Sequence, residues 1–595
     1  GALLQFENNT VGSCSKPITL DNSSLRLQGS NYFLDSEVTV TGTATFDVEN
    51  ARTLTLTNPV TGTGDLVKSV NTGVLTLTGA NTYDGTTTIN AGTLVIGSQG
   101  SFGTLGDGAV VDNGNLTINR PDTAYVVSND ISGTGTVTIG QGTGAAIDSL
   151  VTLTGNNTFT GDVTVNSGGL KIFNASVLGT GTKNVNLTNG TNGRPQLYLD
   201  GTGGDITLPN NIGFRTSSTN TLQPAIGNLA GNNIVEGNIV MTTGGGSSAI
   251  STFGGTLDIK GGISADTSNR RAILGGTGGA GTVSGVISNG TNPVGVDKVG
   301  TVTWTFTGSN SYTGTTAVTE GTLLINGNQS SAGGTVTVSS GATLGGTGTI
   351  GGTVDAIAGS TIAPGASIGT LATVGPVTIA GTFAVELDGI SSDRLSAGGS
   401  LALTGSTLQV TALGAPGQPA YVIASYGLLT GTFGTITGLP SGYTVNYNYN
   451  NLNQIAIVQG SDAYGPWETT NGIAGAGSSA DSDGDGIPNG IEFVIGGDPS
   501  GPDSDSNSLL PTATLDDQYV TFVFRRTDDS AAYNPFAEYG SVLAGWTKAE
   551  GGVNGVIIAE DNNFFEAGVD RVRVQIPRSL AVGSKLFTRL RIDIP

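Results

Sequence analysis

The side chains with the clearest chemical role lie in one short acidic stretch near the C-terminal end of the chain. The stretch reads DSDGDGIPNGIEF and starts at Asp481. Five of its residues fit the pattern D-x-[DN]-x-[DN]-G-x5-E, namely Asp481, Asp483, Asp485, Gly486 and Glu492. In this spacing alternate oxygen donors wrap one hard cation, the glycine permits a sharp turn, and the glutamate returns from a following helix as a bidentate ligand. The pattern therefore predicts a bound cation.

Two further positions complete the expected set of ligands. The backbone carbonyl of Ile487 stands at the seventh position of the loop, and Asn489 stands at the ninth, where a ligand acts directly or through water. A site with this many protein oxygen ligands favours calcium over the smaller magnesium ion. We predict a calcium site, with a solvated acidic linker as the alternative, and its ligands are Asp481, Asp483, Asp485, Ile487, Asn489 and Glu492. One loop without a partner loop favours a structural clamp between domains over a calcium sensor.

The rest of the chain lacks the residues on which most catalysis depends. It contains no histidine, which removes the commonest general base and the commonest zinc ligand. The other acidic groups fall in strand or turn contexts, where we expect water to solvate their charges and no catalytic role is needed. They are Glu386 with Asp388 and Asp393, and Asp528 with Asp529. We predict that the protein is not an enzyme and has no catalytic or organic cofactor site.

Charge and composition exclude several partners. The 23 Lys and Arg residues stand against 45 Asp and Glu, a formal net charge of -22, which repels nucleic-acid phosphates and anionic lipid headgroups. Hydrophobic residues alternate with Thr, Gly and Asn, so we expect no membrane insertion. The chain begins without Met, as in a mature protein whose export signal was removed. The single cysteine, Cys14, cannot pair within the chain, which leaves an idle thiol or an intermolecular bridge.

A repeat organises most of the chain. Three segments align without gaps, at residues 75–97, 151–173 and 304–326. Each has a glycine, an aromatic residue four positions later and further glycines at corners, and the aromatic residues are Tyr83, Phe159 and Tyr312. We expect these rings to pack over a corner, with a sugar-stacking platform as the alternative. A step of 76 residues from the second copy reaches Gly231, which opens a degenerate fourth copy.

The pattern within each copy predicts short strands that stack. Apolar residues stand two apart, as at Leu75 and Leu77, so each strand buries one face. Short strands with Gly and Asn corners suit a coil of stacked turns better than a hairpin meander. Stacking places like residues over like, so corner Asn and Thr can form side-chain ladders. At about 20 to 25 residues and about 4.8 Å per rung, some 430 residues give about 18 to 20 rungs.

The copies resemble a known family. LTLTGANTYDGTTTINAGTLVIG resembles the autotransporter-associated β-strand repeat, and residues 335–371 look like the last rungs of autotransporter passenger domains. The resemblance covers about residues 20–460. It implies a right-handed parallel β-helix on the cell exterior. Autotransporters end in an outer-membrane barrel of strands about 10 residues long, and residues after 460 lack that pattern. We therefore do not expect the chain to export or anchor itself in the family's usual way.

The C-terminal region carries a second resemblance. The acidic loop resembles thrombospondin type 3-like calcium segments near the C-terminus of surface proteins from Verrucomicrobia-like and Planctomycetes-like bacteria, in which nearby strands form a small β-sandwich. The corresponding strands here are Tyr519 to Arg526, residues 572–577, and Leu586 to Ile592. Scarce positive charge gathers there, and we expect it to face solvent or pair locally, with docking on an acidic neighbour as the alternative; its arginines are Arg525, Arg526, Arg571, Arg573, Arg589 and Arg591.

The predicted fold class is all-β. It comprises a right-handed parallel β-helix at residues 1–460, a calcium-loop linker with short helices at 461–505 and a β-sandwich at 506–595. A solenoid has two open ends with unpaired backbone groups. We predict a secreted or cell-surface structural protein that self-associates head to tail, through these ends and the C-terminal module, into a fibre, filament or surface layer. The alternative is a monomeric adhesin that binds cell-surface polysaccharide.

Overall fold

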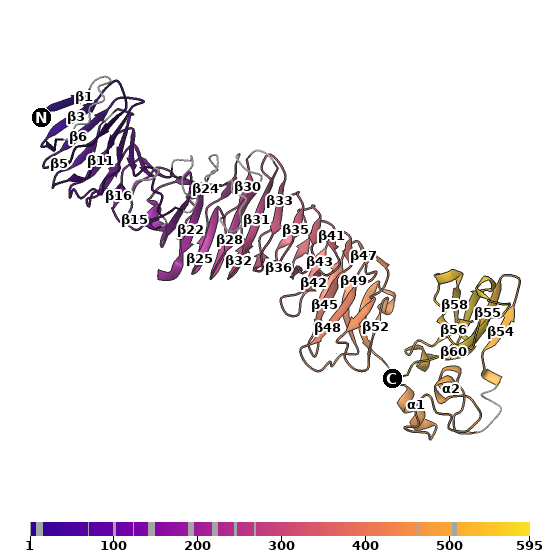
Figure 1. The fold of residues 1–595 in the computed structure, drawn as a ribbon. Helices are drawn as coiled ribbons and strands as arrows, with labels where there is room; N and C mark the ends of the chain where they lie inside the picture. Colours follow the sequence, from indigo (N-terminus) through magenta and orange to yellow (C-terminus); the bar gives the residue numbers. More distant parts are fainter. Residues whose placement is uncertain are drawn as a thin grey trace. The chain divides into compact units, whose positions relative to one another are not determined.

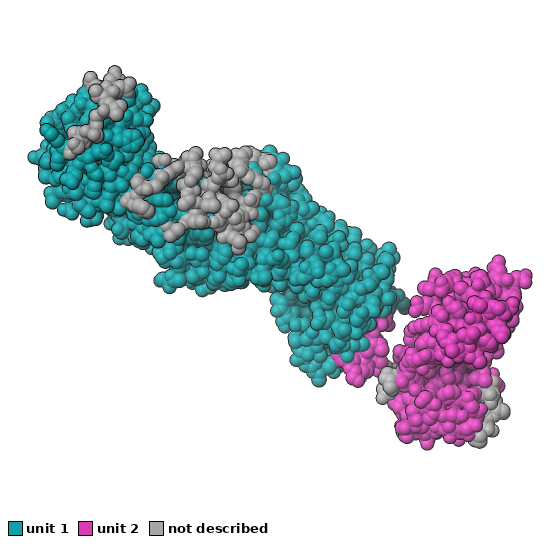
Figure 2. Space-filling view, viewed as in Figure 1, with its two compact units in different colours: residues 1–439, 447–456 teal, residues 440–446, 457–595 magenta. Residues whose placement is uncertain are grey.

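The protein is described by a computed structural model, which divides into two compact units (Figure 2). The first unit comprises residues 1–439 and 447–456, and the second comprises 440–446 and 457–595. The structure describes residues 2–6, 16–69, 71–98, 103–122, 124–140, 149–187, 195–216, 224–242, 247–266, 269–460, 463–501 and 508–594. Cys14 lies outside these described residues.

The first unit is a parallel β-solenoid of about 16 turns (Figure 1). Its longest sheet has 14 strands and runs from β15 (Tyr125–Val127) to β50 (Leu428–Thr430). Within it, strands from successive turns pair in parallel register, as when β18 (Leu150–Leu153) pairs with β20 (Gly169–Ile172). The stacked parallel coil predicted from the sequence is confirmed, and a hairpin meander is ruled out for this unit.

The solenoid has about 16 turns, against the 18 to 20 rungs predicted from the sequence, and its rungs vary in length. Leu75 pairs with Leu94, only 19 positions on, whereas Leu197 pairs with Ile226, which lies 29 positions on. The long rung contains the short helix η2 (Gly201–Gly203) at one of its corners. Such a corner insertion lengthens the path around the core without adding a layer.

The repeat aromatics lie inside the solenoid. Tyr83 and Phe159 have no exposed surface and Tyr312 is 4% exposed. The hydroxyl of Tyr83 lies 2.6 Å from Thr87 Oγ1, and that of Tyr312 lies 2.7 Å from Thr316 Oγ1, so each buried hydroxyl is satisfied within its own copy. A ring without exposed surface cannot stack on a sugar, so the sugar-platform alternative for these residues is wrong.

One buried asparagine joins neighbouring rungs in all four copies of the repeat. Its side-chain Oδ1 accepts the backbone N–H of an apolar residue on the preceding rung, at 2.7 to 2.8 Å. These asparagines are Asn81, Asn157, Asn233 and Asn310, each at most 5% exposed. The degenerate copy keeps this bond, although strand β26 (Asn232–Val235) replaces the turn found in the other copies. The asparagine therefore accepts a hydrogen bond from a backbone amide of the neighbouring rung that the sheets leave without a partner.

We predict that Asn157→Ala destabilises the solenoid by on the order of 2 to 4 kcal/mol. Asn157 Oδ1 accepts from the Ile131 N–H at 2.8 Å and its Nδ2 donates to the Val177 carbonyl at 2.7 Å, so the variant leaves two buried backbone groups without partners. Chemical denaturation followed by circular dichroism measures the loss. The matched control is Asn156→Ala at the exposed neighbouring position, expected to cost less than about 0.5 kcal/mol. Equal stability of the two variants would contradict the bridging role.

A buried carboxyl group lies at the end of strand β13 (Val110–Asp112). Asp112 has no exposed surface. Its Oδ1 accepts the Gly114 N–H at 3.0 Å, and its Oδ2 has no hydrogen-bond partner among the described residues. Burial raises the pKa of Asp112 to about 6, because the charged form loses its hydration. The charged form of Asp112 thus opposes folding at neutral pH.

We predict that Asp112→Asn stabilises the protein at pH 7 but not at pH 4. The folded-state pKa is raised, so this group's contribution is fully present below the unfolded pKa and is lost as the pH rises through about 6. A shift of this size corresponds to on the order of 2 to 3 kcal/mol. Thermal unfolding of both proteins at the two pH values measures it, with Asp107→Asn at an exposed site as the control. A gain at pH 4 equal to that at pH 7 would show that charge burial is not the cause.

The second unit contains two antiparallel sheets. One has the order β54 (Thr512–Leu515), β55 (Tyr519–Thr527), β59 (Val569–Pro577), β58 (Ile557–Glu566), and the other has the order β57 (Thr547–Lys548), β56 (Phe536–Gly540), β60 (Phe587–Arg591). The strands expected near residues 519, 572 and 586 are therefore present. Side chains from both sheets, including Phe522 and Tyr539, share one hydrophobic core.

Among the described residues, no helix has the length and apolar character needed to cross a membrane.

Candidate calcium site

Two short helices flank the acidic loop. Helix α1 (Tyr464–Thr470) precedes it and α2 (Asn489–Ile495) follows directly from its last positions. α2 is anchored because Val494 and Ile495 belong to the hydrophobic core shared by the two sheets. The hydroxyl of Thr527 on β55 also donates to the Phe493 carbonyl at 2.8 Å. The sheets thus fix the end of the loop that carries Glu492.

The three loop aspartates converge. One carboxylate oxygen from each of Asp481, Asp483 and Asp485 lies within 4.8 Å of the others. Asp481 also folds the loop around itself, because its Oδ1 accepts the Gly484 N–H at 2.8 Å and its Oδ2 accepts the Gly486 N–H at 3.0 Å. The structure therefore brings together the first three predicted side-chain ligands.

The chemistry of these carboxylates fits a cation. Asp483 Oδ2 and Asp485 Oδ2 are buried and have no hydrogen-bond partner among the described residues. Three neighbouring negative charges repel one another, and buried anionic oxygens without partners are costly. A bound calcium ion would supply the missing charge and the missing coordination for both oxygens. Gly486, with φ +94°, adopts the left-handed conformation required by the sharp turn at this loop position.

The remaining predicted ligands occupy different environments. Ile487 is 5% exposed and donates its N–H to Asp485 Oδ1 at 2.8 Å. Glu492 has no exposed surface and lies on the first turn of α2. Asn489 is used within the protein: its Oδ1 accepts the Ser482 N–H at 3.1 Å, and its Nδ2 donates to the Gly477 carbonyl at 3.2 Å. Asn489 thus braces the loop here, and its ligand role remains a prediction.

A supporting carboxylate was missed in the sequence because it lies outside the motif. Glu468 on α1 is 7% exposed, and its carboxylate oxygens accept the N–H groups of Gly475 and Gly477 at 3.2 and 2.8 Å. These bonds fix the segment that enters the loop. Tyr464 packs beside it, with its ring 5.3 Å from Phe493 of α2. The only sequence signal was a glutamate in a weak helical segment before the motif.

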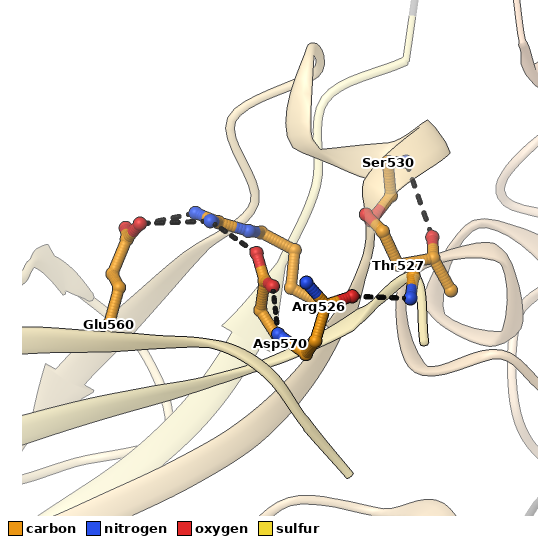
Figure 3. Close-up of polar contacts among 7 residues, drawn as sticks. Arg526, Thr527, Ser530, Glu560 and Asp570 are labelled. Carbon is orange, nitrogen blue, oxygen red and sulfur yellow. Dashed lines mark hydrogen bonds and ion pairs between the residues drawn. The ribbon is translucent and has the colours of Figure 1, made fainter. Parts of the chain in front are cut away.

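The C-terminal arginines pair with nearby carboxylates. Arg526 forms ion pairs with Glu560 at 2.8 Å and Asp570 at 2.9 Å (Figure 3). Beside it, Thr527 Oγ1 accepts the Ser530 N–H at the start of a short helical turn (Figure 3). Each of the other five arginines singled out in the sequence also has a local acidic partner. Local pairing is confirmed, and docking of this unit as a basic module loses its basis.

The acidic group on the solenoid does not form a reactive cluster. Asp393 is 2% exposed, so the expectation that solvation explains it is wrong. Its two carboxylate oxygens accept the N–H groups of Gly369 and Glu386, each at 2.9 Å, and burial raises its pKa to about 6. Asp388 instead caps its own turn by accepting the N–H groups of Ile390 and Ser391. Both carboxylates have structural partners in the backbone.

Comparison with known proteins finds matches to the repeats. The family model for the passenger-associated-transport-repeat matches residues 70–96, 151–172 and 296–325, which contain most of the three aligned copies. The chain is also 30% identical over 275 residues to the Adhesin BmaC autotransporter of Brucella suis biovar 1 (strain 1330). That alignment covers 41% of this chain and 7% of the relative, so the chain spans only a small part of the relative's length. The resemblance to autotransporter passengers is confirmed at this level.

We predict that the protein binds calcium through the acidic loop and that Asp483→Asn with Asp485→Asn weakens this binding at least 100-fold. The double variant keeps the side-chain shapes but removes two anionic ligands. Isothermal titration calorimetry measures binding, with a dissociation constant on the order of 10⁻⁴ M expected for an extracellular module. Calcium should raise the unfolding temperature of the wild-type second unit.

The control for this experiment is Asp498→Asn, which removes a charge at an exposed turn outside the loop. It should bind calcium as the wild type does. No binding heat from the wild type, or equal affinity of the double variant, would show that the loop is a solvated acidic segment.

Proposed function

We propose that this protein is a secreted or cell-surface adhesin of the autotransporter passenger type, whose solenoid presents binding surfaces outside a bacterial cell. The observation that carries the proposal is the stack of three passenger-associated repeats within one parallel solenoid. The similar Brucella protein is named as an adhesin autotransporter, which favours surface adhesion over the other uses of a solenoid. Passenger and adhesin β-helices are generally non-enzymatic, in keeping with a role in binding.

The proposed adhesin also has a right-handed coil, a calcium-clamped loop and a small β-sandwich formed by the two C-terminal sheets. The clamp is supported by the converging Asp481, Asp483 and Asp485 carboxylates and by the anchoring of α2 in the shared core. Calcium would hold the loop in the conformation from which α2 enters the core. The second unit would then resist proteolysis in extracellular fluid, where calcium is abundant.

Head-to-tail assembly through the solenoid ends remains a prediction of the sequence. At the C-terminal end of the solenoid, the ring of Phe433 packs 6.1 Å from Phe383 and 5.9 Å from Tyr447, and Phe433 is 7% exposed. These rings cover part of the last turn, but its strands β50 and β51 (Thr435–Thr437) are exposed, with Leu428 at 66%. We favour adhesion because the similar Brucella protein is named as an adhesin.

We predict that the purified full chain, loaded with calcium, binds saturably to glycan-bearing cell surfaces and that excess soluble chain competes with immobilised chain. Binding is measured on beads against a panel of cell types, while static light scattering of the same samples reports the oligomeric state. Saturable binding by a monomer supports the adhesin. Absence of saturable binding to every surface would overturn it, and polymers without surface binding would favour the fibre instead.

A further inference from the structure

A partly exposed aromatic and cationic patch lies on the outer face of the four-stranded C-terminal sheet. Alternate side chains of β55 and β59, such as Phe524 and Val572, enter the core. The side chains between them therefore face away from the core. On that face β55, the end of β58 and the start of β59 carry the patch, which we define as Arg525, Asp561, Phe564, Phe565, Glu566, Arg571 and Arg573.

The two phenylalanines of the patch are exposed although the fold has a core that accepts such rings. Phe564 is 50% exposed and Phe565 is 40% exposed, whereas Phe522 and Phe524 of the same sheet are 4% and 1% exposed. The two exposed rings meet edge to face with centroids 5.2 Å apart. Exposed neighbouring aromatics on one rigid hairpin are a recurrent feature of binding surfaces.

The arginines of the patch are placed against one another. Arg525 of β55 stands directly opposite Arg571 of β59, an arrangement of like charges that costs stability. The Arg571 guanidinium lies 3.5 Å from the centroid of Phe564, and that of Arg525 lies 4.8 Å from that of Phe565. The rings thus hold both cations over their faces.

The positive charge of the patch is only partly compensated. Arg525 pairs with Glu566, and Asp561 serves both Arg571 at 2.6 Å and Arg573 at 3.4 Å. Three guanidinium groups therefore share two carboxylates, and the side chain of Arg573 is 44% exposed. Within the patch, therefore, one guanidinium group has no carboxylate of its own, while Glu560 and Asp570 beside it are paired with Arg526.

The hairpin holds the patch in a fixed geometry. Asn563 adopts φ +51° at a register shift between β58 and β59. Its N–H donates to Asp570 Oδ1 at 2.9 Å, and its side-chain Oδ1 accepts the Gly568 N–H at 2.7 Å. Asp570 is held in turn by Arg526 (Figure 3). A surface fixed in this way loses little conformational entropy when it binds.

We propose that this patch binds an acidic polysaccharide through its uronate units; the inference rests on the proposed adhesin function and names its ligand class. Phenylalanine rings offer apolar faces to the C–H faces of sugar rings. Guanidinium groups bind carboxylates with two parallel hydrogen bonds, and Arg573 is available for this. The carboxylates of Asp561 and Glu566 accept hydrogen bonds from sugar hydroxyls. At about 0.15 M salt the Debye length is about 8 Å, so the distant acidic residues of the chain repel the polymer only weakly.

The test uses the full chain and hyaluronate, an alternating uronate polymer, in biolayer interferometry at 0.15 M salt. Carboxyl-reduced hyaluronate, which has the same backbone without the anionic groups, is the ligand control. The wild type should bind hyaluronate and bind the reduced polymer at least 10-fold more weakly. Phe564→Ala with Phe565→Ala, and separately Arg571→Ala with Arg573→Ala, should each lose at least 10-fold in affinity.

The matched control is Arg589→Ala, on the other sheet of the same unit, with Trp546→Ala just before β57. There the Arg589 guanidinium lies 4.3 Å from the Trp546 ring and pairs with Glu538, so the variant removes a similar pair of side chains elsewhere. It should bind hyaluronate as the wild type does. Thermal unfolding of every variant verifies that the second unit remains folded.

The possible outcomes separate this inference from the adhesin proposal. No wild-type binding to hyaluronate, equal binding of the reduced polymer, or unchanged affinity of both patch variants would overturn the patch as a uronate site. If the patch variants still adhere to cells as the wild type does, the adhesin proposal stands and the patch is not its binding surface. Cell binding that is lost after protease treatment of the cells, but not after glycan removal, would indicate a protein partner and would also overturn the inference.

Discussion

The solenoid depends on satisfying backbone groups at corners where parallel strands end. Each turn leaves amides and carbonyls outside the sheets, and these groups cannot be buried without partners. Asparagines such as Asn81 and Asn157 satisfy amides from the previous rung. Lys68 and Lys298, which have no exposed surface, satisfy carbonyls: Lys68 Nζ donates to the Asn71 carbonyl at 2.6 Å and Lys298 Nζ donates to the Gly300 carbonyl at 2.7 Å. Burial lowers the pKa of both lysines to about 8, so these polar groups are retained at a cost in solvation.

A solenoid gains stability mainly between adjacent layers, so the loss of one bridge weakens two neighbouring rungs and leaves distant ones unchanged. The second unit is organised differently. There α2 supplies Val494 and Ile495 to a core built from two antiparallel sheets, and Glu492 of the same helix belongs to the acidic loop. A cation bound by the loop would therefore be coupled to the packing of this core through one short helix.

The sequence was sufficient for the parts of the structure that depend on local patterns. Apolar residues two apart predicted buried strand faces, and the aligned repeats predicted their stacking. Rung length was not predictable, because corner insertions such as η2 have no periodic signature. The asparagines were expected in corner ladders of like residues, yet Asn157 bonds to backbone groups of Ile131 and Val177 on two different rungs. A position in a repeat indicates where a side chain lies, but not which neighbouring group lacks a partner.

At the candidate calcium site, too, the sequence predicted the residues set by local spacing but not those set by tertiary packing. The motif predicted that Asp481, Asp483 and Asp485 converge, because their spacing alone brings alternate carboxylates to one side of a tight turn. Glu468 was missed because its contact with the entering segment arises from tertiary packing of α1.

The charge balance of the second unit limits what its arginines can do. Six arginines are concentrated there, but residues 457–595 contain 9 Lys and Arg against 20 Asp and Glu. A unit with that balance is not drawn over long distances to an acidic partner. Any recognition of an anion must therefore arise at contact distance, where Arg573 and the two exposed phenylalanine rings act on a ligand already beside them.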